Sequence, residues 1–119
     1  MVDNRHVVVF NSTFVNCSSQ LGGALLLKNV DVQIEQATFL RNRASVNGGA
    51  IAFDCCTDCG LESYTKCQYS FKNSTCEENT ANDAGGCFYT YLYPVEDYQT
   101  ITYLENYASY GPDFGAFAF

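Results

Sequence analysis

A double glycine followed by a short apolar stretch recurs along the chain. The motif reads LGGALLL at 21–27, NGGAIAF at 47–53 and AGGCFYT at 84–90, and the sequence closes on FGAFAF at 114–119. An asparagine stands six residues before the first glycine of each pair, and a fourth asparagine precedes the closing stretch. Self-similarity at such a period indicates one supersecondary unit per repeat, with each unit stacked on its neighbours.

The asparagines divide the chain into four repeats. They are Asn16, Asn42, Asn79 and Asn106, so the steps between them are 26, 37 and 27 residues. We therefore expect a single domain, 1–119, with repeats at about 7–29, 30–54, 55–93 and 94–119. The longer step predicts an insertion of about eleven residues in the third repeat.

The residues after each glycine pair alternate in hydrophobicity, as in a strand with one buried face. Those expected to point inward are Leu25, Leu27, Ile51, Phe53, Phe88, Thr90, Phe117 and Phe119. Two further strands precede each glycine pair, and the shorter of them carries Phe14, Phe39, Cys76 or Tyr103. Three short strands per repeat predict an all-β fold, a parallel β-helix of about four coils. An antiparallel sandwich is the alternative, but hairpins do not require one Asn-to-Gly spacing three times over.

The glycines and asparagines are expected to build the turns. Glycine tolerates positive φ without steric strain, and an asparagine side chain bonds backbone groups at a turn. Stacked asparagines can also bond each other between coils about 4.8 Å apart. The predicted turn ladder comprises Asn16, Asn42, Asn79 and Asn106 with the pairs Gly22 and Gly23, Gly48 and Gly49, and Gly85 and Gly86.

The seven cysteines predict disulfides. We expect Cys76 to pair with Cys87, and two bridges among Cys55, Cys56, Cys59 and Cys67, although six cysteines allow fifteen connectivities. These four make the inserted loop disulfide-rich. A zinc site at Cys56 and Cys59 is a weaker alternative, because no second pair stands at ligand spacing. Seven is odd, so one thiol is free or pairs with another chain, and Cys17, alone in its repeat, is the candidate.

Charge and composition limit the partners. Thirteen acidic residues against six basic ones give a net charge of −7, which argues against nucleic acid and anionic membranes. No apolar run is long enough to span a membrane. The cysteines and three Asn-x-Ser/Thr sequons indicate an extracellular or cell-surface protein. Because the first residues, MVDNRHVVVF, do not read as a secretory signal, we expect a mature chain or part of a longer one.

The three sequons are expected to differ. Asn11 and Asn73 both align with Gln36, at a polar corner between two strands, so we expect both to be glycosylated in a secretory pathway. Asn16 is expected to stay unmodified, since the predicted ladder uses its amide.

No catalytic constellation is evident. The carboxylates are scattered, the bases are few, and the one histidine, His6, lies near the start of the chain. We therefore expect a protein that is not an enzyme, with no metal and no cofactor.

The tyrosines offer a binding surface. All nine follow position 63, and Tyr89, Tyr91 and Tyr93 alternate, so they share a strand face. They either cover a neighbouring coil or form an interaction face for a protein or a sugar ring.

The pair FLRN at 39–42 and GGAI at 48–51 resembles the repeat of chlamydial polymorphic outer-membrane proteins, and also the repeats of very large protist surface proteins. The resemblance extends over about 7–119, is fullest in the second repeat, and weakens where Cys76 and Cys87 replace the aromatic residue and the alanine. It implies a right-handed parallel β-helix outside the cell with a structural or adhesive role.

Two functions follow from these patterns. The first is an extracellular structural protein that stacks end to end into a filament or surface layer, or a segment of a larger adhesin. Its partners are copies of itself, head to tail, or adjacent coils of a longer chain, because neither VVVF at 7–10 nor GAFAF at 115–119 looks capped. The second is an adhesion module that binds carbohydrate or protein through the tyrosine-rich face.

Overall fold

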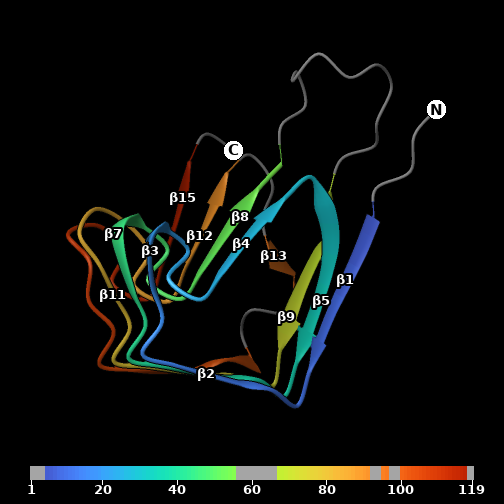
Figure 1. Ribbon diagram of the computed structural model, residues 1–119, viewed down its shortest axis with the longest axis horizontal. Helices are drawn as coiled ribbons and strands as arrows, with labels where there is room; N and C mark the ends of the chain where they lie inside the picture. Colours follow the sequence, from blue (N-terminus) through green and yellow to red (C-terminus); the bar gives the residue numbers. More distant parts are fainter. Residues whose placement is uncertain (1–4, 56–66, 92–94, 97–99, 118–119) are drawn as a thin grey trace.

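The computed structural model describes residues 5–55, 67–91, 95–96 and 100–117, and these residues form strands that run in four successive passes (Figure 1). The first pass contains β1 (Arg5–Phe10), β2 (Thr13–Val15), β3 (Ser18–Leu21) and β4 (Leu25–Lys28). The second contains β5 (Val30–Glu35), β6 (Thr38–Leu40), β7 (Arg43–Asn47) and β8 (Ile51–Asp54). The third contains β9 (Tyr69–Lys72), β10 (Thr75–Glu77), β11 (Thr80–Ala81) and β12 (Phe88–Tyr91). The fourth contains β13 (Val95–Glu96), β14 (Thr102–Leu104) and β15 (Phe114–Phe117).

Corresponding strands of successive passes pair in parallel. The four sheets have the orders β1-β5-β9-β13, β2-β6-β10-β14, β3-β7-β11 and β4-β8-β12-β15. In the view down the shortest axis, the strands of each sheet lie behind one another (Figure 1). The prediction of an all-β protein with parallel sheets is confirmed, and the pairing is consistent with a β-solenoid.

The corners between strands use a left-handed backbone. The residues there that are not glycine and have positive φ fall into rows, among them Asn11, Gln36 and Asn73 at one corner and Asn16, Arg41, Glu78 and Glu105 at the next. The first glycine of each predicted pair also has positive φ, 70° at Gly48. The second glycine serves a different purpose, because a Cβ atom on Gly49 would lie 2.1 Å from the carbonyl oxygen of Gly86 in the next pass. The glycine pair therefore supplies both the turn and the close approach of two passes.

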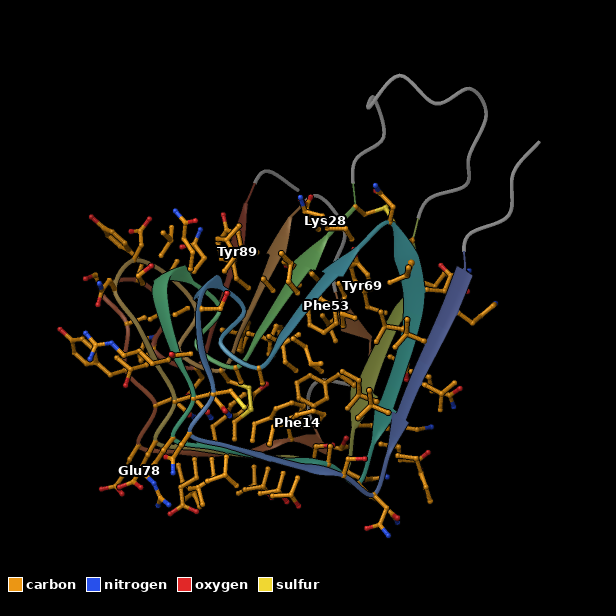
Figure 2. All side chains as sticks on the ribbon, viewed as in Figure 1. Phe14, Lys28, Phe53, Tyr69, Glu78 and Tyr89 are labelled. Carbon is orange, nitrogen blue, oxygen red and sulfur yellow. A yellow bond between two sulfur atoms is a disulfide. The ribbon has the colours of Figure 1, made fainter. Side chains whose placement is uncertain are left out.

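The main core lies between three of the sheets, and the side chains of Phe14, Phe53 and Tyr69 point into it (Figure 2). The Phe14 and Phe39 rings stack with centroids 5.1 Å apart, and Phe53 contacts Tyr69 and Phe88. The sheet β3-β7-β11 has its own small core, whose buried residues are Ala44, Ala81 and Ala108. Burial of the apolar side chains stabilises the stack by about 1.5–3 kcal/mol for each large residue that is fully enclosed.

The inward-facing residues after the glycine pairs agree with the expected alternation in three passes and differ in the fourth. Leu27, Phe53 and Thr90 are buried, but Phe88 pairs with Phe114 rather than Phe117. The prediction for Phe117 is wrong because the turn glycine of this pass is Gly111, with φ of 58°, followed by Pro112. The strand β15 consequently begins at Phe114, three residues before Phe117, the residue expected to align with Phe88, and Phe119 lies outside the described residues.

Candidate functional site

Three asparagines form a hydrogen-bonded ladder through the stack. The Nδ2 of Asn42 donates to the Oδ1 of Asn79 at 3.0 Å, and the Nδ2 of Asn79 donates to the Oδ1 of Asn106 at 3.0 Å. The same oxygens accept the backbone N–H groups of Asn42 and Asn79, both at 2.9 Å. Asn42 and Asn79 are almost fully buried. Each amide therefore joins two passes by both side-chain and backbone hydrogen bonds.

The same side chains also satisfy carbonyl groups of the pass before them. The Nδ2 atoms of Asn42, Asn79 and Asn106 donate to the carbonyl oxygens of Phe14, Phe39 and Cys76, at 3.1, 2.9 and 3.0 Å. Buried backbone groups without a partner cost free energy comparable to a lost hydrogen bond. The ladder thus allows the backbone carbonyl groups of a tight corner to be buried, because each of them accepts a hydrogen bond from an asparagine amide.

Asn16 is not part of this ladder, and the expectation for it is wrong. Phe14 pairs with Phe39, so Cys17 occupies the position of Asn42, and the Cys17 N–H donates to the Oδ1 of Asn42 at 3.0 Å. The first pass has one residue fewer between its aromatic residue and its asparagine, which moves Asn16 to the exposed corner. There its Oδ1 accepts a hydrogen bond from the Nε of Arg41 at 3.3 Å.

The ladder changes chemistry at both ends. At the first pass, Cys17 has no amide, and its thiol donates only to the carbonyl oxygen of Val15 at 3.7 Å. At the fourth pass, the Nδ2 of Asn106 donates to the Oδ1 of Asp113 at 3.4 Å, in place of a fourth asparagine in the ladder. Cys17 has no disulfide partner among the described residues, in agreement with its predicted role as the free thiol.

Two disulfides join cysteines that the structure describes. Cys76 pairs with Cys87 and Cys55 with Cys67, as expected, while Cys56 and Cys59 lie outside the described residues. The Cys76–Cys87 bond crosses the core at the position where Phe39 faces Ala50 in the second pass. In the third pass, the disulfide therefore stands where the second pass has the aromatic side chain of Phe39 and the small side chain of Ala50.

The sequon asparagines lie on exposed corners. The register places Asn11 and Asn73 opposite Gln36, as expected, and Asn16 lies at the next corner. Since Asn16 is exposed and free of the ladder, the argument that its amide is occupied no longer holds.

The predicted tyrosine face is only partly described. The Tyr89 side chain is half-buried, and its ring lies near Gly115 of the neighbouring strand, so it covers that strand. The Tyr91 side chain and Tyr93 lie outside the described part of the chain. Of the tyrosines whose side chains the structure describes, Tyr107 and Tyr110 are strongly exposed, at 62% and 71%, and the alternation pattern could not single them out.

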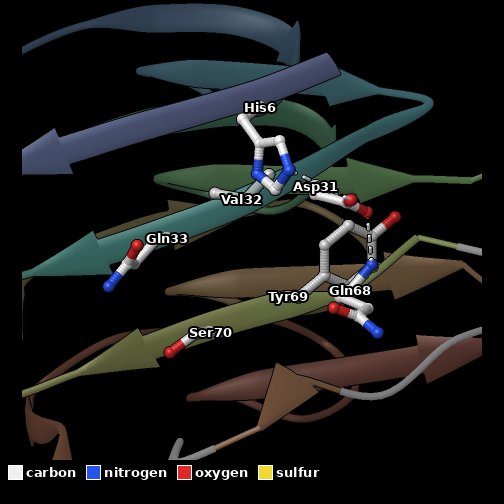
Figure 3. A pocket seen from close by; sticks show the side chains of 7 residues that line it. All are labelled: His6, Asp31, Val32, Gln33, Gln68, Tyr69 and Ser70. Atoms are coloured by element: carbon white, nitrogen blue, oxygen red, sulfur yellow. Dashed lines mark hydrogen bonds and ion pairs between the residues drawn. The ribbon is translucent and has the colours of Figure 1, made fainter. Parts of the chain in front are cut away.

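A shallow hollow of about 160 Å³ lies on the outer side of the sheet β1-β5-β9 (Figure 3). Asp31 lies at its centre, with one oxygen accepting the Gln68 N–H at 2.8 Å and the other 3.8 Å from the Nε2 of the exposed His6. Gln33 and Ser70 complete the polar lining. Among the described residues no group of three or more His, Cys, Asp or Glu could hold a metal ion. In the same part of the chain, no helix has the length and hydropathy to cross a membrane.

The two ends of the stack leave strand edges open. β1, β2, β3 and β4 have a described neighbour on one side only, and so do β13, β14 and β15 at the opposite end. Four inward-facing residues of the first pass, Val7, Val9, Phe14 and Leu25, are half-buried, whereas Leu27 is buried. Their partners in the second pass, Val32, Ile34, Phe39 and Ile51, are at most 4% exposed.

Comparison with known proteins gives one match. No curated protein and no solved structure matches the chain. A family model does match, and the segment concerned runs from the corner at Gln36 through β6 and β7 to the end of β8. This segment contains both FLRN and GGAI, so the predicted resemblance is confirmed for it. Residues 36–54 match the Chlamydia polymorphic membrane protein repeat.

Proposed function

We propose that this chain is an extracellular structural module without catalytic activity that stacks end to end. In this proposal the four passes form a right-handed parallel β-helix, with a disulfide-rich loop inserted in the third coil. Its partners are further coils of the same kind, from other copies or from the same polypeptide, in a filament, a surface layer or a larger adhesin.

The comparison between the first and second passes carries this proposal. Four inward positions are half-buried in the first pass, at Val7, Val9, Phe14 and Leu25, where no described strand lies beyond them, and are buried in the second pass, where one does. A strand edge with unpaired N–H and C=O groups beside apolar side chains is a template for further strand pairing. One more pass, placed by the step that relates the first pass to the second, would bury all of them.

The proportions of the molecule favour the same role. Its extents are 41 × 28 × 22 Å, and the passes stack along the shortest of these directions (Figure 1). The two open ends are therefore the broadest faces. Contact between one end and the opposite end of another copy is heterologous, so it propagates instead of closing.

Three features support an extracellular location. The disulfides Cys55–Cys67 and Cys76–Cys87 form and persist in oxidising compartments. The matched repeat is that of a membrane protein family. The sequons at Asn11 and Asn73 lie on exposed corners, and we extend the expectation of N-glycosylation to Asn16 because it lies on one too. Glycans at these corners point sideways and leave the ends free to stack.

Electron microscopy of the purified chain tests the proposal. A single copy is only about 19 Å tall, since four coils are spaced about 4.8 Å apart. We expect rods whose length exceeds their width, and dispersed particles of single-copy size would contradict stacking.

A further inference from the structure

We propose that Tyr107 and Tyr110, together with the polar residues between and beside them, bind a neutral oligosaccharide on the side of the stack. The two rings are 62% and 71% exposed. Ala108, between them, is buried in the small alanine core, so the backbone of this segment lies against the protein. The exposed rings are therefore presented by a fixed backbone.

Backbone hydrogen bonds hold both tyrosines. The Tyr107 N–H donates to the carbonyl oxygen of Asn79, and its own carbonyl oxygen accepts the Ala81 N–H, both at 2.9 Å. The Tyr110 N–H donates to the carbonyl oxygen of Asp83 at 2.9 Å, and its carbonyl oxygen accepts the Gly85 N–H at 3.0 Å. Rigid aromatic side chains give large contact area at low cost in conformational entropy, since the backbone is already ordered before a ligand arrives.

Polar groups accompany the rings. Ser109 lies between the tyrosines, and its hydroxyl donates to the carbonyl oxygen of Asn82 at 2.8 Å. Asn82 and Asp83 are exposed in the adjacent pass. An aromatic face for the apolar C–H side of a sugar ring, with amide, carboxylate and hydroxyl groups for its hydroxyls, is the combination that carbohydrate recognition requires.

The charge of the surroundings selects a neutral sugar. The charged residues that flank the patch along the chain, Glu105 and Asp113, are acidic, and so is Asp83, whose carbonyl oxygen accepts the Tyr110 N–H. Arg43 lies on the same side of the stack but two strands away from Tyr107, because Arg43 pairs with Thr80 and Thr80 pairs with Tyr107. Sulfated or sialylated chains would meet like charge here, which disfavours binding.

The size of the patch argues against a protein partner. Two tyrosines bury at most about 150–250 Å² each. A stable protein–protein interface needs about 800 Å² on each partner. Because the residues between the rings are polar, the patch suits a small ligand better than a macromolecular surface.

Titration calorimetry with the full chain tests this site. The probes are cellohexaose and N-acetylchitohexaose as neutral chains, with a heparin-derived hexasaccharide as the anionic comparison. We expect at least one neutral hexaose to bind, and Tyr107→Ala and Tyr110→Ala each to raise Kd about tenfold, the change that corresponds to a stacking contact of about 1.4 kcal/mol. Tyr107→Phe and Tyr110→Phe keep the ring and should retain binding.

Phe10→Ala is the matched control, because Phe10 is also an exposed aromatic residue, 58% exposed, but lies on β1. It should leave Kd unchanged, and unchanged thermal unfolding should show that all variants fold. The site is refuted if neither neutral hexaose binds at millimolar concentration, or if the two alanine variants bind as well as the unmodified chain. Tighter binding of the heparin hexasaccharide would overturn the predicted ligand class.

Discussion

At the scale of single residues, the asparagine ladder explains why the repeats have their spacing. Asn79 accepts two hydrogen bonds from Asn42 and donates to Phe39 and Asn106, all inside the protein. Low local dielectric strengthens such a network and makes an incomplete one costly. The ladder is therefore both a source of stability and a constraint on register.

Removing one member of the ladder should destabilise the whole stack. We expect Asn79→Ala to lower the free energy of unfolding by about 2–4 kcal/mol, because it leaves buried donors and acceptors unpaired on both neighbouring passes. Chemical denaturation monitored by circular dichroism measures this. Asn82→Ala is the control, since Asn82 is exposed, and an equal loss in both variants would contradict a special role for the ladder.

Extending the ladder should have the opposite effect. In Cys17→Asn, the new side-chain amide occupies the position in the first pass that is equivalent to Asn42 in the second. It can therefore donate to the Oδ1 of Asn42, as Asn42 donates to the Oδ1 of Asn79. We expect the free energy of unfolding to rise by about 0.5–1.5 kcal/mol relative to Cys17→Ser, which removes the thiol without adding an amide. If the two variants are equally stable, the ladder ends at Asn42 for a reason other than the missing amide.

The sequence predicted most of this ladder and misplaced one residue. The spacing from asparagine to glycine located Asn42, Asn79 and Asn106, but at Asn16 it competed with the spacing from the aromatic residue. The structure follows the aromatic residue, because Phe14 stacks on Phe39 and core packing sets the register of the strand. Counting three residues from Phe14 would have found Cys17.

At the scale of strands and turns, alternation and glycine pairs predicted which residues face the core. They failed in the fourth pass, where Gly111 and Pro112 replace the glycine pair. Here the backbone requirement decided the register: the residue with positive φ is Gly111, while Gly115 pairs with Tyr89 inside a strand. The sequence does not show whether a glycine is needed for a positive φ at a turn or lies within a strand, so it could not distinguish Gly111 from Gly115.

The close approach of passes at the second glycine makes a sharp prediction. We expect Gly49→Ala to prevent folding or to cost at least 3 kcal/mol, because its Cβ would meet backbone atoms of Gly86 and Thr80 that cannot move without separating the passes. Gly115→Ala is the control, since its nearest contacts are 3.2 Å or more away, and it should cost far less. Thermal unfolding compares the two, and a tolerated Gly49→Ala would show that the passes are farther apart than described.

At the scale of the whole molecule, the open ends of the stack are the surfaces through which we propose that it assembles. The parallel pairing could be predicted from sequence, because each repeat contains the same strand pattern. The difference between the ends could not be predicted. It depends on Cys17 and Asp113, which take part in the ladder only through the three-dimensional register.

One substitution should block assembly without disturbing the fold. The N–H of Asn11 donates to β5, and successive N–H groups of a parallel strand point to opposite neighbours, so the Val8 N–H points to the open edge. We expect Val8→Pro to abolish end-to-end stacking while keeping the protein folded. Val9→Pro is the matched control, because it removes a hydrogen bond to β5 and should destabilise the monomer instead. Rods that persist with Val8→Pro would show that this edge is not the contact.

The central claim, that the open ends pair with further coils, is tested most directly by the mass of the purified chain in solution. Static light scattering at micromolar concentration should give a mass several times the 13.2 kDa of one chain, rising with concentration because a heterologous contact does not close. A constant mass near 13.2 kDa over the whole range would contradict the account.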